Sequence, residues 1–300
     1  MTMVTVRKEE RNGNTYYYLE HSYRVAGRTV KKEKYLGKTI PKDIEKIRNL
    51  FLHELYAERW YSKFERIRRE FEKEQEAMPQ EGLRKYLESF MIKFTYDTQK
   101  IEGSTLSFKD TRNILVLGIT PPNKSIADVK EVEQHRRVFY KMLEMRKDIS
   151  LRLILEWHYE LFKETKADIA GKVRRHQVAI GGSKFIPPSP IEIDALLDDF
   201  IRWYNKNKMK TNPVHLSALV HLKFVTIHPF TDGNGRMSRL LMNFVLHKNG
   251  CPMMNIEYKN RSSYYTSLER SQAKVNDGAF IQWFFRRYLE ANRMYLRSTV

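Results

Sequence analysis

Cysteine is nearly absent from this 300-residue chain, and long apolar runs are missing altogether. The single cysteine, Cys251, excludes an internal disulfide bond, so nothing indicates an oxidising compartment. No run approaches the roughly 18 apolar residues that a membrane-spanning helix needs. The first residues also lack the apolar core of a secretory signal. These absences predict a globular protein of the cytoplasm.

Acidic residues are scarce relative to basic ones. The chain has 54 Lys and Arg against 36 Asp and Glu, which gives a formal net charge of +18. Such an excess favours attraction to nucleic acid, ribosomes or other acidic surfaces, although charge alone does not define a function.

The segment 228–239 reads HPFTDGNGRMSR and concentrates the chemistry of the chain. Gly233 and Gly235 flank Asn234, so the backbone can take positive φ angles and turn successive N–H groups toward an anion. Apolar residues recur with helical spacing after Arg236, which predicts that a buried helix begins here. A phosphate would then lie at a helix N-terminus, where free N–H groups and the helix dipole favour it.

The charged side chains of the same segment suit phosphoryl or nucleotidyl transfer. Arg236 and Arg239 are three residues apart on the predicted helix, so both can reach phosphate oxygens. Asp232 is a hard oxygen ligand, of the kind that holds Mg2+ together with substrate phosphates. His228, at the end of the preceding predicted helix, can accept a proton near neutral pH. The cluster predicts transfer of a phosphate-containing group to a hydroxyl.

Segment 228–239 resembles the signature of the Fic family, HxFx(D/E)GNGRxxR, at every specified position. The similarity extends over roughly residues 83–290. It implies a mainly α, Fic-type helical bundle with a β-hairpin flap. The implied activity is transfer of AMP from ATP to a Ser, Thr or Tyr hydroxyl of a target protein or of the enzyme itself, with ATP and Mg2+ as co-substrate and cofactor.

The resemblance also assigns roles to residues of the signature. His228 would be the general base, Asp232 would hold Mg2+, and Arg236 would neutralise charge on the departing pyrophosphate. The implied phosphate-binding set is Gly233, Asn234, Gly235, Arg236 and Arg239. This division of labour suits phosphoryl-type transfer, in which positioning and electrostatic stabilisation supply most of the catalysis.

Two further segments resemble parts of Fic proteins. Residues 170–174, AGKVR, look like the lead-in to the target-docking flap, and Gly181-Gly182 at the middle of 177–186 predicts its hairpin. Residues 260–265 look like the segment that closes over the nucleotide, so Tyr264 and Tyr265 are candidate adenine contacts. Ordinary packing is the alternative for both, because tyrosine is abundant throughout the chain.

A second motif, TQKIEG at residues 98–103, resembles the Fic inhibitory pattern (S/T)xxxE(G/N). Apolar residues with helical spacing precede it, so an inhibitory helix is predicted over about 83–103. The resemblance implies that Glu102 pairs with Arg239 and takes the place of the γ-phosphate of ATP, which predicts a weakly active enzyme. In some relatives the same glutamate serves to remove AMP instead. Without the signature downstream, Glu102 and Gly103 would be interpreted as an ordinary helix end.

The remaining patterns predict how the chain is organised. Residues 1–40 predict a basic three-stranded antiparallel β-meander, because short β-prone runs alternate with Asn-Gly and Ala-Gly turns. Residues 41–82 predict a long charged helix and linker, which could pack on the sheet, pair with a second copy in a homodimer, or bridge to the catalytic part. Residues 83–290 are the predicted Fic catalytic domain, and 291–300 a C-terminal tail.

Two alternative interpretations concern a metal site and nucleic-acid binding. A zinc site built on His215, His221 and His228 is disfavoured, because no HExxH motif or cysteine pair accompanies them. A nucleic-acid-associated binding protein, in which the Fic part only senses nucleotide, is a rival from another functional class. In that case the basic meander would contact nucleic-acid phosphates. A structural or dimer-forming addition is the simpler role for the same module.

Overall fold

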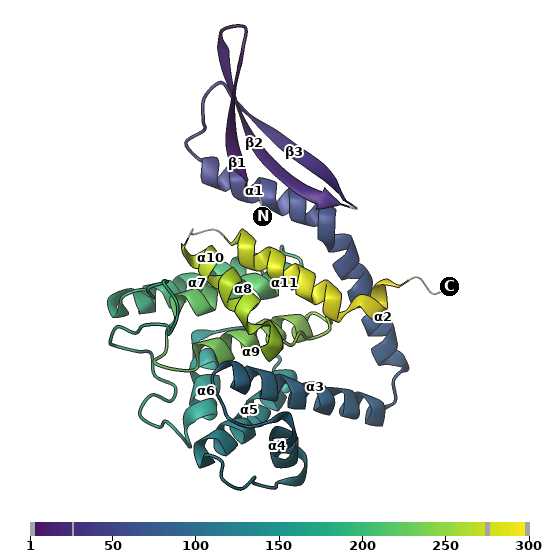
Figure 1. Cartoon of the computed structure of the whole chain (residues 1–300), viewed down its shortest axis with the longest axis vertical. Coiled ribbons are helices and arrows are strands. Elements are labelled where there is room, and N and C mark those ends of the chain that lie inside the picture. Colours follow the sequence, from purple (N-terminus) through teal and green to yellow (C-terminus); the bar gives the residue numbers. More distant parts are fainter. Residues whose placement is uncertain (1–3, 26, 274–276, 298–300) are drawn as a thin grey trace. The chain divides into compact units, whose positions relative to one another are not determined.

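The computed structural model describes residues 4–25, 27–273 and 277–297. The first residues of the expected meander, residue 26 in its second turn, and residues 298–300 of the expected C-terminal tail lie outside the described residues. The chain divides into two compact units, residues 1–65 and 66–300. Each unit is described by itself (Figure 1).

The first unit contains the three-stranded antiparallel sheet that the sequence predicts. Its strands are β1 (Thr5–Arg11), β2 (Asn14–Val25) and β3 (Arg28–Gly37), in the order β1-β2-β3. Asn12 and Gly13 both have positive φ, as a tight hairpin turn requires. Helix α1 (Ile44–Tyr56) covers one face of the sheet, where its Phe51 and Leu55 join a core cluster with residues of β1 and β2. A sheet this small needs such a cover to be stable.

The expected long helix is interrupted once. A π-helical turn (Ala57–Tyr61) follows α1 and leads into α2 (Ser62–Ala77). The border between the two units, at residues 65 and 66, falls inside α2.

The second unit is helical, which confirms the predicted fold class. Its α-helices are α3 (Gln80–Ile101), α4 (Phe108–Arg112), α5 (Ile126–Glu144), α6 (Leu151–Phe162), α7 (Ile193–Asn207), α8 (Pro213–Ile227), α9 (Asn234–Lys248), α10 (Arg261–Ala273) and α11 (Gly278–Ala291). Helices α8 and α9 pack closely and bury almost every residue, so they form the centre of the unit. No helix of the described residues is both long and apolar enough to cross a membrane.

Local sequence explains where α8 and α9 begin. Asn212 caps α8, because its side chain accepts a hydrogen bond from the N–H of Val214, and Pro213 occupies the first helical position. Helix α9 follows Gly233, which has a φ of 82°. The loop between the two helices is therefore held between two buried elements.

The flap differs from the prediction. Among the described residues, 177–186 form no paired strands and instead make an irregular loop with a turn, in which the N–H of Ser183 donates to the carbonyl of Ile180. The N–H of Lys184 donates to Glu269 on α10. Pro187 and Pro188, which directly follow this segment, have no N–H to donate and could not extend a strand pairing beyond Ile186. The predicted β-hairpin is wrong in its pairing, although the turn lies at Gly181-Gly182 as expected.

Candidate active site

His228 lies directly after the C-terminus of α8 in a left-handed conformation, with φ 53° and ψ 55°. Its Nδ1 atom lies 3.2 Å from the carbonyl oxygen of Val225. Since a carbonyl can only accept, Nδ1 carries the proton, and Nε2 keeps a free lone pair. Burial lowers the pKa of His228, which favours the neutral form at physiological pH.

The loop after His228 is shaped by its own side chains. Asn234 accepts from the N–H of Phe230 at 2.9 Å and donates to the carbonyl of Phe230 at 2.7 Å. Its side chain is thus a structural clamp, and only its backbone N–H is available to an anion. At Gly233, any Cβ would clash with the ring of Phe162, so no larger residue fits.

Arg236 lies in a buried ionic cluster. Its guanidinium is 3% exposed, pairs with Glu131 of α5, and lies 3.1 Å from Asp232 Oδ1. Lys166 reaches Asp232 Oδ2 at 2.6 Å. Although burial opposes ionisation, Arg236 and Lys166 lower the pKa of Asp232 to about 2. Asp232 is therefore a carboxylate at physiological pH.

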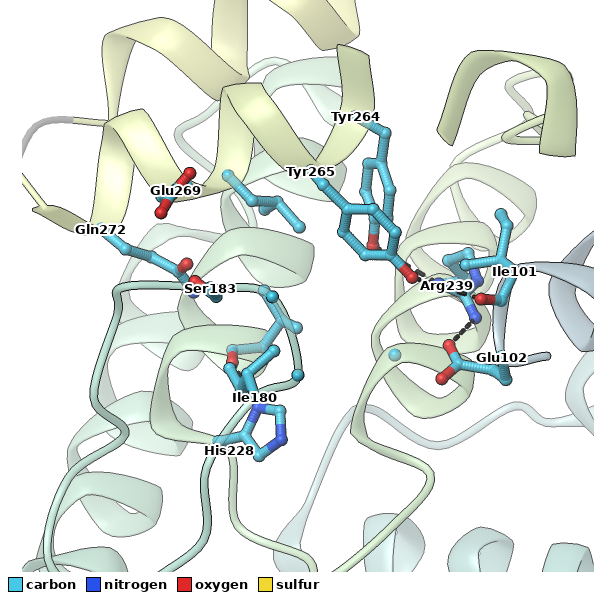
Figure 2. A pocket seen from close by; sticks show the side chains of 15 residues that line it. Ile101, Glu102, Ile180, Ser183, His228, Arg239, Tyr264, Tyr265, Glu269 and Gln272 are labelled. Carbon is cyan, nitrogen blue, oxygen red and sulfur yellow. Dashed lines mark hydrogen bonds and ion pairs between the residues drawn. The ribbon is translucent and has the colours of Figure 1, made fainter. Parts of the chain in front are cut away.

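Arg239, one helical turn further along α9, lies in a separate cluster. Its side chain is 1% exposed and donates to Thr98 Oγ1 at 2.7 Å. It also donates to Glu102 Oε1 at 2.5 Å (Figure 2). The hydroxyl of Tyr264 lies 3.4 Å from Nη1. Although burial disfavours the charge, the Glu102 carboxylate raises the pKa of Arg239, so the guanidinium stays charged. Gly235 lies against the same carboxylate, which leaves no room for a Cβ.

His228, Arg239 and Glu102 line a pocket of about 540 Å³, which is within the usual range for a small-molecule site. It contains six of the predicted site residues: Glu102, His228, Gly235, Arg239, Tyr264 and Tyr265. Figure 2 shows Glu102 and Arg239 on one side of the pocket, with His228 and the flap residues Ile180 and Ser183 on the other. Asp232, Gly233, Asn234 and Arg236 belong to the adjoining loop and α9 but do not line the pocket.

The two tyrosines differ. Tyr264 is fully buried, contacts Arg239, and lies 3.0 Å from His221 Nε2, so packing accounts for it. Burial raises the pKa of Tyr264 to about 12, and its hydroxyl therefore stays protonated. Tyr265 is 45% exposed and donates only to the carbonyl of Ile101 at 3.3 Å. Its ring is the more available of the two for a ligand.

Comparison with known proteins identifies one family region in the chain. A family model described as the Fic/DOC family matches residues 148–246, which include the whole segment from His228 to Arg239. Residues 148–246 of the chain are therefore a Fic/DOC-type region.

Curated relatives of this chain are named protein adenylyltransferases. The protein named fic-1 from Caenorhabditis briggsae is 36% identical over 193 residues, which are 62% of this chain and 38% of the relative. The Drosophila melanogaster protein named Fic is 36% identical over 192 residues, which are 63% of this chain and 39% of the relative. The chain thus matches only about two fifths of the length of these relatives.

Solved structures agree on the fold. Fic-1 from C. elegans superposes with a TM-score of 0.68 at 27% identity, covering 85% of this chain and 76% of that one. A Fic-domain signalling protein from Bacteroides thetaiotaomicron gives a TM-score of 0.69 at 26% identity, covering 77% of this chain and 95% of that one.

Two side chains that support the Fic loop were missed by sequence analysis. His158 of α6 accepts from the N–H of Gly171 at Nδ1, so its Nε2 donates to the carbonyl of Asp232 at 3.0 Å. Burial lowers the pKa of His158 to about 4, which keeps this neutral tautomer. No local pattern marks His158, because its partners lie 13 and 74 residues away.

Arg174, the last residue of the AGKVR segment, is not the exposed charge that an arginine usually is. It is buried and donates to the carbonyls of His228, His176 and Pro188 at 2.8, 2.9 and 2.7 Å. The backbone N–H of Arg174 donates to the carbonyl of Pro229 at 2.9 Å. One arginine therefore joins the base of the flap to the catalytic loop. Its place in the AGKVR segment was the available signal.

Metal-binding capacity at this site rests on one carboxylate. Among the residues that the structure describes, no group of three or more His, Cys, Asp or Glu side chains could hold a metal ion. His215 and His221 are buried in α8. Asp232 alone suits an ion that takes most of its ligands from substrate phosphates and water, as Mg2+ does.

Proposed function

We propose that this Fic protein transfers AMP from ATP to a hydroxyl group of a protein side chain, and that Glu102 holds it in a weakly active state. The observation that carries the proposal is the pocket itself. It brings together a neutral histidine with a free Nε2, the start of α9 and a buried arginine. The names of the curated relatives agree with this activity.

The proposed reaction follows from the tautomer of His228. Nε2 accepts the proton of the incoming Ser, Thr or Tyr hydroxyl, whose oxygen then forms a bond to the α-phosphorus. The bond from that phosphorus to the oxygen bridging the α- and β-phosphates breaks, and pyrophosphate leaves with the electron pair. The lowered pKa of His228 keeps the base unprotonated and ready at neutral pH.

The α9 N-terminus supplies the binding of phosphate. The backbone N–H groups of Asn234 and Gly235 and the positive end of the helix dipole favour the negative charge of the nucleotide. Asp232 would hold Mg2+ together with phosphate oxygens, and the ion would neutralise part of the phosphate charge. Arg236 contributes its charge from behind the loop, because its guanidinium is held by Glu131 and Asp232.

Glu102 is the proposed inhibitor. Its carboxylate is bonded to Arg239 and lies against Gly235, at the start of the helix that would receive the phosphates. A γ-phosphate at that position would have to displace a carboxylate already paired with the same guanidinium. ATP would then bind weakly or in an unproductive pose. Removal of AMP from a modified target is a second activity that the same glutamate could support.

The nucleic-acid-binding alternative is less favoured by the first unit. On one face of the sheet, Glu9, Glu20 and Glu33 are each paired with two of the cations Arg7, Arg11 and Lys31. Cations that are already neutralised by carboxylates offer little to phosphates.

The test is self-labelling with ATP that carries the label on the α-phosphate, in the presence of Mg2+. We expect a faint signal from the wild type, a strong one from Glu102→Gly, and loss of about 100-fold or more when His228→Ala is added. Label from α-phosphate but not from γ-phosphate identifies AMP as the group transferred. Equal labelling with and without His228 would refute the proposed mechanism, and labelling of a target protein alone would exclude self-modification.

A further inference from the structure

Lys166 occupies a position that the Fic signature does not account for. Its Nζ atom lies 2.6 Å from Asp232 Oδ2 and 2.9 Å from Glu131 Oε1. Arg236 contacts the other oxygen of each carboxylate. The four side chains thus form a closed ring in which two cations alternate with two carboxylates. Every carboxylate oxygen of the ring already faces a positive charge.

The two halves of this ring differ in exposure. Arg236 and Glu131 are 3% and 11% exposed and are fixed in the interior. Lys166 and Asp232 are each 37% exposed. Asp232 Oδ1 accepts from the N–H of Gly233 at 2.5 Å and from Arg236, so Oδ2 is the oxygen that a ligand from solvent can approach. Among the residues that the structure describes, the cation in contact with Oδ2 is the ammonium of Lys166.

We propose that Lys166 is a built-in cation that competes with divalent metal for Asp232 Oδ2. A divalent ion and an ammonium repel one another and prefer the same carboxylate oxygen. Lysine suits this role, because its compact charge sits on a flexible stem that can swing away. When no metal is bound, the same charge lies beside the loop that binds phosphate. This inference rests on the proposed function, which makes Asp232 the metal ligand.

An ordinary surface ion pair would neither compete with a metal ion nor supply charge to the phosphate-binding loop, because an exposed pair contributes little and is screened by salt. Lys166 is more constrained than such a pair. It bonds two carboxylates from different elements and lies 5.2 Å from the ring centre of Phe162, the residue that also packs against Arg236.

The first test measures Mn2+ binding to the protein alone by electron paramagnetic resonance. Lys166→Met should bind Mn2+ on the order of tenfold more tightly than the wild type, because a cation next to the ligand is removed. Lys166→Arg, which keeps the charge, should stay close to the wild type, and Asp232→Asn should remove the binding in either background. Lys163→Met is the matched control, since Lys163 pairs with Glu160, 3.1 Å away and outside the ring. Equal affinities in wild type and Lys166→Met, or no measurable Mn2+ binding by either, would overturn the inference.

The second test measures binding of a non-hydrolysable ATP analogue in the Glu102→Gly background. With EDTA, Lys166→Met should bind the analogue several-fold more weakly, and with saturating Mg2+ it should bind it equally well or better. A purely structural role would weaken binding in both conditions and would lower the melting temperature as well. Absence of analogue binding in all variants would count against the proposed function. The role of Lys166 is decided separately, because the Mn2+ affinities are measured without nucleotide.

Discussion

Helix α9 carries two buried arginines, Arg236 and Arg239, and each is paired with a glutamate from another helix. The partner of Arg236 is Glu131 in the middle of α5, where its side chain is 11% exposed. The partner of Arg239 is Glu102 at the C-terminal cap of α3, where its side chain is 26% exposed and faces the pocket. One pair is part of the interior, and the other lines the pocket. The same ion pair can thus stabilise a fold or regulate a site, according to where its acidic partner is anchored.

The largest effect should come from breaking the interior pair. Glu131→Ala would leave the guanidinium of Arg236 short of a buried partner, which should lower the free energy of unfolding by about 3–5 kcal/mol. Urea denaturation measures this. Glu133→Ala, at a more exposed position on the same helix, is the control and should change stability by less than about 1 kcal/mol. Similar losses for the two variants would show that the Arg236 cluster is not a structural anchor.

Breaking the pair in the pocket, between Glu102 and Arg239, should change the rate of AMP transfer more than the stability. Glu102→Gly should raise AMP transfer about tenfold to a hundredfold, because it removes a competitor of the γ-phosphate. Its cost in stability should stay near 1 kcal/mol, since Arg239 keeps its bonds to Thr98. The rate of label incorporation and a urea titration on the same preparation test both parts. A large loss of stability without gain of activity would place Glu102 among the structural partners, like Glu131.

A smaller effect is expected at Tyr264. Tyr264→Phe removes the hydroxyl that lies near both Arg239 and His221, at an expected cost of about 1 kcal/mol in stability. In the Glu102→Gly background it should also weaken nucleotide binding a few-fold, because Arg239 is then less well oriented. Tyr265→Phe removes a hydroxyl on an exposed ring and should change stability less. If the order of the two variants is reversed, Tyr264 does not help to hold Arg239.

The smallest effect is electrostatic and extends across the pocket. Burial lowers the pKa of His228, and the carboxylate of Glu102 partly opposes this by favouring the imidazolium. Glu102→Gln should therefore lower the pKa of His228 further, so that the base stays neutral to a more acidic pH. Nuclear magnetic resonance titration of the histidine ring checks the direction. Glu131→Gln, on the interior pair, is the comparison and should move the His228 titration less.

Prediction from sequence succeeded where chemistry and structure are local. The start of α9, the turn at Gly233 and the C-terminal position of Glu102 on α3 all follow from neighbouring residues. The resemblance also anticipated the contact between Glu102 and Arg239. Local patterns are informative here because caps, turns and helical periodicity act within a few residues.

The partners of the charged groups could not be predicted in the same way. Glu131 and Arg236 are 105 residues apart, and Lys166 and Asp232 are 66 apart. Only the packing of α5 and the α6 region against α9 decides which charges meet. The prediction of a β-hairpin in the flap was wrong for a different reason. Gly181-Gly182 indicates a turn, but it does not show that the N–H of Lys184 bonds to the side chain of Glu269 instead of to a paired strand.

Helix α3 carries both Thr98 and Glu102, which are one helical turn apart and both bond to Arg239. Whether both side chains face Arg239 depends on their angular position around the helix, because each residue advances an α-helix by about 100°. Deleting a single residue upstream in α3 would turn Glu102 by that amount while leaving its chemistry, its charge and the whole of α9 unaltered. The inhibition proposed for Glu102 therefore depends on the rotational setting of α3, and a rotation of this helix should release it as well as a substitution.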